Sequence, residues 1–172
     1  MNPIQLSKEL RHNSTPYLRN RRRIAGLCVV GMAGLSALAM YQMGLLKKLP
    51  ELPFSAFDSE KVISSDAAYS QFGVPDGVLG IASYATTLAL AAAGGADRAR
   101  TDPALPLALA AKVGFDVYQA GKHCMSQWTE HHVFCSWCLL PALASFAMAP
   151  LIWPEARAAL AAVRPLTHLK AA

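Results

Sequence analysis

Charged residues are scarce in this 172-residue chain, where Asp, Glu, Lys and Arg make up 16% and hydrophobic residues 53%. An ordinary soluble domain is about 25% charged. The composition excludes a disordered acidic chain, and four cysteines are too few for a disulfide-stapled mini-protein. The length suits one domain and leaves no room for a second of normal size. The chain is therefore expected to contact lipid.

Acidic residues are almost missing from the N-terminus. The first 23 residues carry six Lys and Arg with only Glu9 to oppose them, whereas the rest of the chain holds ten residues of each sign. The net charge of +5 therefore lies entirely in this segment. A basic tail before an apolar run orients a membrane protein and contacts anionic lipid. It gives no reason to expect nucleic-acid binding.

Four long apolar segments follow the basic tail. They are residues 24–46, 74–96, 103–121 and 133–153. The first has no charged residue and is long enough to cross about 30 Å of hydrocarbon. It is too long for a cleaved signal peptide, and no small-residue cleavage site follows it. Because backbone in lipid must satisfy its own hydrogen bonds, the sequence predicts an all-α, integral membrane four-helix bundle.

The third segment carries two opposite charges, Lys112 and Asp116. Four residues apart on a helix, they share one face and can neutralise each other. A stabilising ion pair is the simple interpretation, and a proton route through the membrane is the functional one.

Basic residues next to membrane spans concentrate on the cytoplasmic side. This rule places the N-terminus in the cytoplasm, and four spans return the C-terminus there. The predicted organisation is a basic cytoplasmic tail (1–23), a membrane domain (24–153) and a second cytoplasmic tail (154–172). Residues 47–73 and 122–132 are then expected to face outward.

Three of the four cysteines lie on the expected outward side. Cys135 and Cys138 form a CxxC at the start of the fourth segment, Cys124 precedes them, and Cys28 is expected to be a buried apolar side chain. At CxxC spacing two sulfurs meet within one helical turn, and a helix N-terminus stabilises a thiolate. A redox pair, half of a metal site and coincidence remain open interpretations.

Histidines near the CxxC support a metal alternative. The donors of that alternative are His123, Cys124, His131 and His132, together with the CxxC. Thiolate and imidazole suit zinc or monovalent copper, although the standard structural-zinc spacings are not present. A metal-handling membrane protein therefore stays as an alternative.

Two segments resemble the vitamin K epoxide reductase family, in its bacterial disulfide-forming branch. VISSDAAYSQFGVPDGVLGIASYA (62–85) is similar to the family's loop and second helix. FCSWCLLPALASFA (134–147) is similar to its fourth helix with the CxxC. The order, spacing and four-span layout agree over about residues 20–153.

The resemblance implies a quinone-linked thiol–disulfide oxidoreductase in the bacterial inner membrane, with the CxxC facing the periplasm. Cys135 and Cys138 match the pair that passes electrons to a quinone, ubiquinone or menaquinone. Ser64 and Ser65 match a Ser-rich step beside the quinone head group, and Trp137 is a further candidate for that pocket. The expected electron donor is a thioredoxin-like periplasmic protein or another thiol substrate.

The chain departs from the family pattern in its first loop. Residues 47–73 contain no cysteine, Ser59 stands about where the second loop cysteine is expected, and Ala142 replaces a tyrosine that often follows the CxxC. Three mechanisms remain open. Cys124 relays electrons in place of the loop pair; or a partner attacks an exposed Cys135, with Cys138 deeper beside the quinone; or the fold persists as a redox-inactive scaffold or accessory subunit of a membrane complex.

Overall fold

The computed structural model describes residues 2–54, 56–69 and 73–169, and over these residues the chain is helical with no β-strand. The expected all-α class is confirmed. In chain order the elements are α1 (Pro3–His12), α2 (Pro16–Gln42), α3 (Ser59–Ile63), the 3₁₀ turn η1 (Asp66–Tyr69), α4 (Asp76–Ala92), α5 (Arg98–Thr101), α6 (Ala104–Ser126), the π-helical turn η2 (Gln127–His131) and α7 (Ser136–Leu169).

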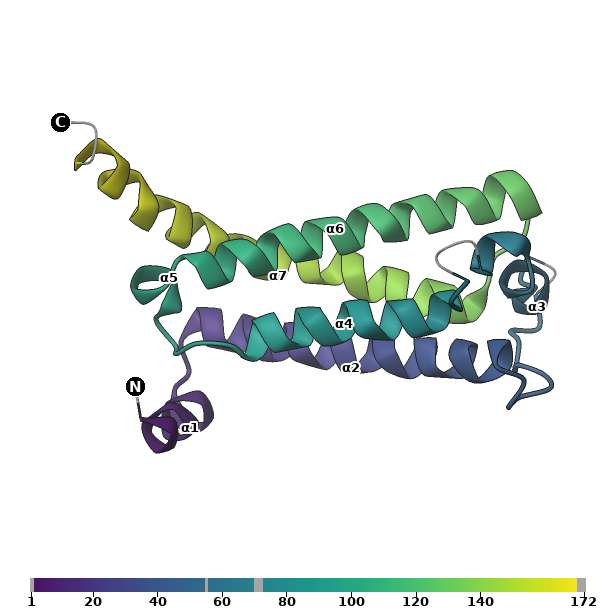
Figure 1. Ribbon diagram of the computed structural model, residues 1–172, viewed down its shortest axis with the longest axis horizontal. Coiled ribbons are helices and arrows are strands. Elements are labelled where there is room, and N and C mark those ends of the chain that lie inside the picture. Colours follow the sequence, from purple (N-terminus) through teal and green to yellow (C-terminus); the bar gives the residue numbers. More distant parts are fainter. Residues whose placement is uncertain (1, 55, 70–72, 170–172) are drawn as a thin grey trace.

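Four long helices form an elongated bundle, with α1 and α5 at one end and α3 at the other (Figure 1). Helix α2 packs on α4 and α7, and α6 packs on α7 and α4. The core between them is built from apolar side chains such as Ile24, Leu109, Val113 and Met148, each almost fully buried. Each of the four expected segments therefore corresponds to one long helix.

The helix ends differ from the expected segments. Helix α2 begins at Pro16, because the Thr15 hydroxyl accepts the Leu18 N–H at 3.3 Å and proline suits a first helical turn. It ends at Gln42, so the expected span 24–46 runs past it into a turn at Gly44. Neither expected tail boundary lies at the end of a helix. Helix α2 runs through residues 23 and 24, and α7 runs through residues 153 and 154.

Residues 122–132, expected to face outward between two spans, are helical up to His131. Helix α6 continues to Ser126, and η2 extends it to His131. His132 then adopts a left-handed conformation (φ 56°), and the chain turns toward α7. Five of the six residues 126–131 are polar, and this obscured the extension in the sequence.

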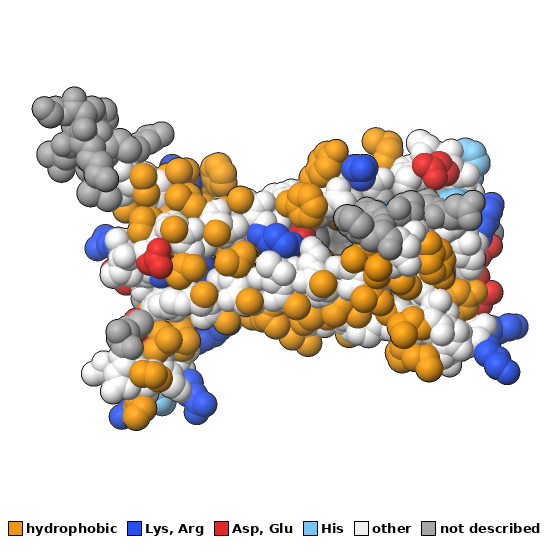
Figure 2. All heavy atoms as spheres, viewed as in Figure 1, with side chains coloured by type: hydrophobic (Ala, Val, Ile, Leu, Met, Phe, Trp, Pro, Cys, Tyr) orange, Lys and Arg blue, Asp and Glu red, His pale blue; other side chains and the backbone are white. Residues whose placement is uncertain are grey.

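Among the described residues, two helices are long and apolar enough to cross a membrane: α2, and α7 from Ser136 to Val163. Helix α4 is apolar but has only 17 residues. Apolar side chains on the outside of α2 and α7 are exposed, among them Val29, Val30 and Leu143. Figure 2 shows such side chains along the length of the bundle, with most charged ones toward its ends. This distribution suits lipid around the bundle's sides.

Two arginines close the C-terminal end of α4. Arg21 donates to the carbonyls of Ala91 (2.7 Å) and Gly95 (2.9 Å), and to others between them. Arg98 donates to Leu90 and Ala93 and pairs with Glu155 of α7 at 2.9 Å. The guanidinium groups satisfy carbonyls that have no partner within the helix and oppose the negative end of its dipole.

Glycine allows α4 to approach α2 closely. A Cβ atom at Gly77 would lie 2.7 Å from the backbone nitrogen of Ala39 and 3.0 Å from the carbonyl oxygen of Leu35. Both atoms belong to the α2 backbone, so neither can move without shifting the helix. This contact sets the distance between the two helices at the α3 end of the bundle.

We therefore predict that Gly77→Ala destabilises the fold by about 1–3 kcal/mol, the usual cost of overpacking. Gly114→Ala on α6 is the matched control, because a Cβ there meets nothing within 4 Å. The control is expected to unfold at or slightly above the wild-type temperature, since alanine favours a helix. Thermal unfolding in detergent measures both variants, and equal midpoints for the two would contradict the close approach.

Candidate functional site

The CxxC forms a disulfide at the N-terminus of α7. Cys135 lies directly before the helix, Cys138 lies in its first turn, and their Cα atoms are 5.2 Å apart. The backbone N–H of Cys138 donates to the Cys135 sulfur at 3.1 Å. The sulfur thus occupies the place of a helix cap, where the free N–H groups of the first turn favour negative charge on a thiolate.

The loop between α2 and α4 is paired to the segment that carries the CxxC. The Phe134 N–H donates to the Ala56 carbonyl at 2.8 Å, and the Asp58 N–H donates to the Phe134 carbonyl at 3.0 Å. The Trp137 indole N–H also donates to the Pro50 carbonyl, at 2.8 Å. These contacts join residues about 80 positions apart in the sequence.

Ser59 and Glu51 complete this attachment. The Ser59 hydroxyl accepts the Ser136 N–H at 3.1 Å, and the Glu51 carboxylate accepts both the Ser59 N–H (2.7 Å) and the Ser136 hydroxyl. Burial alone would raise the pKa of Glu51, but these hydrogen bonds outweigh it and hold the pKa below its usual 4.5. We call residues 50–59, with their contacts to 134–137, the loop clamp.

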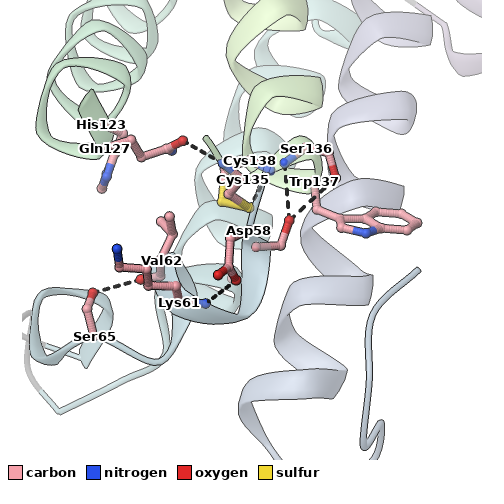
Figure 3. The surroundings of a disulfide bond; sticks show 12 residues. Asp58, Lys61, Val62, Ser65, His123, Gln127, Cys135, Ser136, Trp137 and Cys138 are labelled. Atoms are coloured by element: carbon pink, nitrogen blue, oxygen red, sulfur yellow. Dashed lines mark hydrogen bonds between the residues drawn. A yellow bond between two sulfur atoms is a disulfide. The ribbon is translucent and has the colours of Figure 1, made fainter. Parts of the chain in front are cut away.

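Gln127 holds Cys135 from the opposite side. Its side-chain oxygen accepts the Cys135 N–H at 2.9 Å, and only 4% of the residue is exposed. The π-helical turn η2 brings Gln127 to this position, and Figure 3 shows its side chain directed toward the cysteine pair.

The two sulfurs differ in access. Cys135 has no exposed surface, whereas Cys138 is only partly buried. The expectation that Cys135 is the exposed member of the pair is therefore wrong. The loop clamp and Gln127 cover it, and neither contact was visible in the local sequence.

Cys138 lies on the wall of a cavity of about 430 Å³ between the four long helices. Apolar walls come from Leu35 and Leu38 of α2, Leu79 of α4 and Phe115 of α6. The polar lining includes Gln42, Ser65, Ser126 and Gln127, together with two further groups. One is Asp76, Gln119, Lys122, His123, Glu130 and His131; the other is Ser83, Tyr84, Asp116 and Ser145.

The second polar group forms two separate sets of hydrogen bonds, one around Asp116 and one around Tyr84. Asp116 pairs with Lys112 as the sequence predicts, and its carboxylate also accepts the hydroxyls of Ser83 (2.9 Å) and Thr87 (2.8 Å). Nearby, the Tyr84 hydroxyl contacts the Ser145 hydroxyl at 2.7 Å and the Pro141 carbonyl. These bonds tie α4 to α6 and α7 inside the bundle.

The three residues expected around a quinone are separated. Ser65 lines the cavity, with its hydroxyl donating to the Val62 carbonyl at 2.7 Å. Ser64 is exposed and is not part of the lining. Trp137 is also absent from the lining, and Figure 3 shows its ring directed away from the disulfide. Their part in quinone binding stays a prediction.

The other two cysteines are free. Cys28 is fully buried with its sulfur 3.8 Å from that of Met148, as expected for an apolar side chain. Cys124 is partly buried on α6, one helical turn before Gln127, and does not line the cavity. Its role as a relay stays a prediction.

The histidines do not form a metal centre with the cysteines. His123 and His131 line the cavity, His132 is exposed beside Trp128, and Cys124 lies off the cavity wall. Over the described ranges 2–54, 56–69 and 73–169, no three His, Cys, Asp or Glu side chains are close enough to hold one ion.

Several site residues were not singled out for these roles from the sequence, because their partners are distant. They are Glu51, Gln127, Tyr84 and Ser145, and Ser59 was noted only as the replacement for a cysteine. Ser59 caps α7, which begins 77 residues later at Ser136. Gln127 accepts the backbone N–H of Cys135 from the far side of the turn between α6 and α7. Only the Lys112–Asp116 pair carried a local signal, its spacing of four residues.

The structure thus combines an apolar helical bundle with a cysteine pair beside a cavity, an arrangement that suits a membrane thiol oxidoreductase. The family model of the vitamin K epoxide reductase family matches residues 22–153. The chain belongs to this family, and it is accordingly a membrane protein with the family's oxidoreductase character. No curated protein matches the chain.

We predict that Glu51→Gln loosens the loop clamp and speeds reduction of the Cys135–Cys138 disulfide about threefold to tenfold at pH 7. Because the folded pKa of Glu51 is lowered, its contribution is present above pH 4.5 and is lost as the pH falls through the folded value. The ratio of variant to wild-type rates should therefore approach one in acid. A phosphine reductant and thiol counting from pH 3 to pH 7 measure this ratio.

Glu60→Gln in α3 is the control for charge alone, because Glu60 has no side-chain hydrogen bond to the CxxC segment and should keep the wild-type rate. A Glu51→Gln variant that is reduced at the wild-type rate at every pH would contradict the clamp.

Proposed function

We propose that this chain is a quinone-linked thiol–disulfide oxidoreductase that passes electrons from a thiol donor through Cys135 and Cys138 to a membrane quinone. The observation that carries the proposal is the position of the disulfide, with Cys138 on the wall of a cavity of about 430 Å³. Membership of the vitamin K epoxide reductase family supports it.

The cavity suits a quinone head group in size and chemistry. Small-molecule sites usually enclose about 300–1,000 Å³, with mostly apolar walls and a few polar groups. Leu35, Leu38, Leu79 and Phe115 provide apolar walls, and hydroxyl groups lie at one end. A bound quinone supplies a two-electron acceptor. Ubiquinone and menaquinone both fit this description.

The cysteine pair accounts for both halves of the reaction. A donor thiolate attacks one sulfur of the pair, and a second donor thiol completes the donor's own disulfide and leaves Cys135 and Cys138 reduced. Cys138, on the cavity wall, then delivers the two electrons to the acceptor, and the Cys135–Cys138 bond forms again. Ser59 and Gln127 hold the backbone of the pair in place through this cycle.

The loop clamp governs where electrons enter. With the clamp closed, Cys138 is the accessible sulfur, so a small thiol reaches the pair only through the cavity. A protein donor, for example a thioredoxin-like periplasmic protein, is too large for that route. It therefore attacks Cys135 after the clamp opens, or reacts first with Cys124, which lies partly exposed on α6.

The membrane arrangement proposed is four spans, α2, α4, α6 and α7, in the bacterial inner membrane. Basic Arg19, Arg22 and Arg23 at the start of α2 are exposed and favour the cytoplasmic side, which places both termini there. The opposite end of the bundle, with the CxxC and the α2–α4 loop, then faces the periplasm, an oxidising compartment.

Quinol formation tests the function directly. Prereduced protein in detergent is mixed with a short-chain quinone, and quinol absorbance is followed. Cys135→Ser and Cys138→Ser are each expected to reduce quinol formation to the rate without protein. Cys28→Ala, at a buried site that is not part of the cavity lining, is expected to stay within about twofold of wild type. Wild-type protein that forms no quinol would leave the scaffold or accessory-subunit alternative standing.

The relay role of Cys124 requires a separate comparison. Cys124→Ser is expected to slow reduction of the pair by a protein dithiol and to leave quinol formation by the prereduced pair unchanged. Equal rates of reduction by the protein dithiol with and without Cys124 would remove the relay.

Orientation is tested with single cysteines in a cysteine-free chain. Lys48→Cys and Arg100→Cys are both at exposed positions, at opposite ends of the bundle. An impermeant thiol reagent is expected to label the variant at position 48 in cells with a permeable outer membrane, and the variant at position 100 only after the inner membrane is broken. The reverse pattern would overturn the orientation.

A further inference from the structure

Two charged side chains lie within the bundle at the cavity. Asp116 is 5% exposed and Lys112 17% exposed, and the two form an ion pair. Burying charge is costly even when it is paired, and apolar residues of similar volume often serve stability equally well. An ionisable pair inside a membrane bundle is therefore a candidate for function.

Ser83 connects this pair to the cavity. The Lys112 ammonium donates to the Ser83 hydroxyl at 2.8 Å, and that hydroxyl donates to Asp116 at 2.9 Å. Ser83 and Asp116 both line the cavity, whereas Lys112 lies behind them. The Ser83 hydroxyl has one proton, which it donates to Asp116, so it must turn from Asp116 toward the cavity to give that proton to a bound molecule. Lys112, which donates to the same oxygen, is in place to replace the proton.

The network lies at the other end of the cavity from the sulfur. Tyr84, next to Ser83 on α4, contacts Ser145 of α7. Ser145 follows Cys138 by seven residues, a rise of about 10 Å along the helix. Cys138 and Ser83 would therefore face different parts of a quinone held in the cavity.

We propose that Ser83, recharged by Lys112 and held by Asp116, is the proton donor to the quinone oxygen remote from Cys138. This inference rests on the proposed function. Oxidising two thiols releases two electrons and two protons, and quinol formation consumes two of each. One thiol proton serves the oxygen near the sulfur. Ser83 gives its proton to the remote oxygen, and Lys112 gives a proton to Ser83. The neutral Lys112 then takes up one proton, which balances the second proton that the thiols release.

Two hydroxyls provide a matched comparison. Ser83 and Thr87 both donate to Asp116, but only Ser83 lines the cavity. Ser83→Ala and Thr87→Val each remove one hydrogen bond from the same carboxylate. A purely structural network predicts a loss in both variants, whereas proton donation predicts a loss only for Ser83→Ala.

Lys112→Arg separates charge from proton transfer. Arginine keeps the positive charge and the contact with Asp116, but its guanidinium does not release a proton in proteins. The variant is expected to bind quinone and unfold like wild type, yet form quinol slowly.

The experiment combines quinone binding, stability and single-turnover quinol formation. Binding to the disulfide form is followed by tryptophan fluorescence, which needs no turnover. Ser83→Ala and Lys112→Arg are expected to bind within about threefold of wild type and to form quinol about 10- to 100-fold more slowly, in the lower part of the range for general acid catalysis. Thr87→Val is expected to stay within about twofold in both measurements.

Equal slowing in Ser83→Ala and Thr87→Val, or a wild-type rate in Lys112→Arg, would overturn proton donation while leaving the oxidoreductase function intact. A loss of binding that matches the loss of rate would assign Ser83 to holding the quinone and would also overturn the proposal. If the proposed oxidoreductase function is wrong, wild-type protein forms no quinol. That outcome differs from every result that bears on Ser83 alone.

Discussion

The site depends on the N–H groups at the start of α7, which have no hydrogen-bond partner within the helix. A helix leaves its first four N–H groups without partners inside the helix. Here the Ser136 N–H donates to the Ser59 hydroxyl, and the Cys138 N–H donates to the Cys135 sulfur. Just before the helix, the Cys135 N–H donates to the Gln127 side-chain oxygen. One set of hydrogen bonds therefore positions the redox pair, attaches the α2–α4 loop and buries Cys135.

The same hydrogen bonds give the two sulfurs of the pair different surroundings. Covering Cys135 from the loop side leaves Cys138 as the sulfur that meets the cavity. In the proposed reaction, the acceptor and a protein donor approach from different directions, and only the donor requires movement of the loop clamp. A site without loop cysteines can in this way keep thiol exchange and quinone reduction apart.

The sequence predicted what depends on local pattern and missed what depends on distant contacts. Apolar runs gave the four long helices, and the spacing of Lys112 and Asp116 gave their pairing. The extension of α6 to His131 was missed because its last turns are polar and packed against the site. The burial of Cys135 was missed because its cover, the loop clamp, comes from residues almost 80 positions earlier. Hydrophobic periodicity carries no information about such contacts.

The central claim is that Cys135 and Cys138 alone exchange two electrons with a quinone. The most direct measurement is an anaerobic single turnover of fully reduced protein, with quinol and residue-specific free thiols counted together. We expect one quinol per chain, loss of the Cys135 and Cys138 thiols, and retention of the thiols of Cys28 and Cys124. Quinol formed while Cys135 and Cys138 stay reduced, or no quinol at all, would contradict this claim.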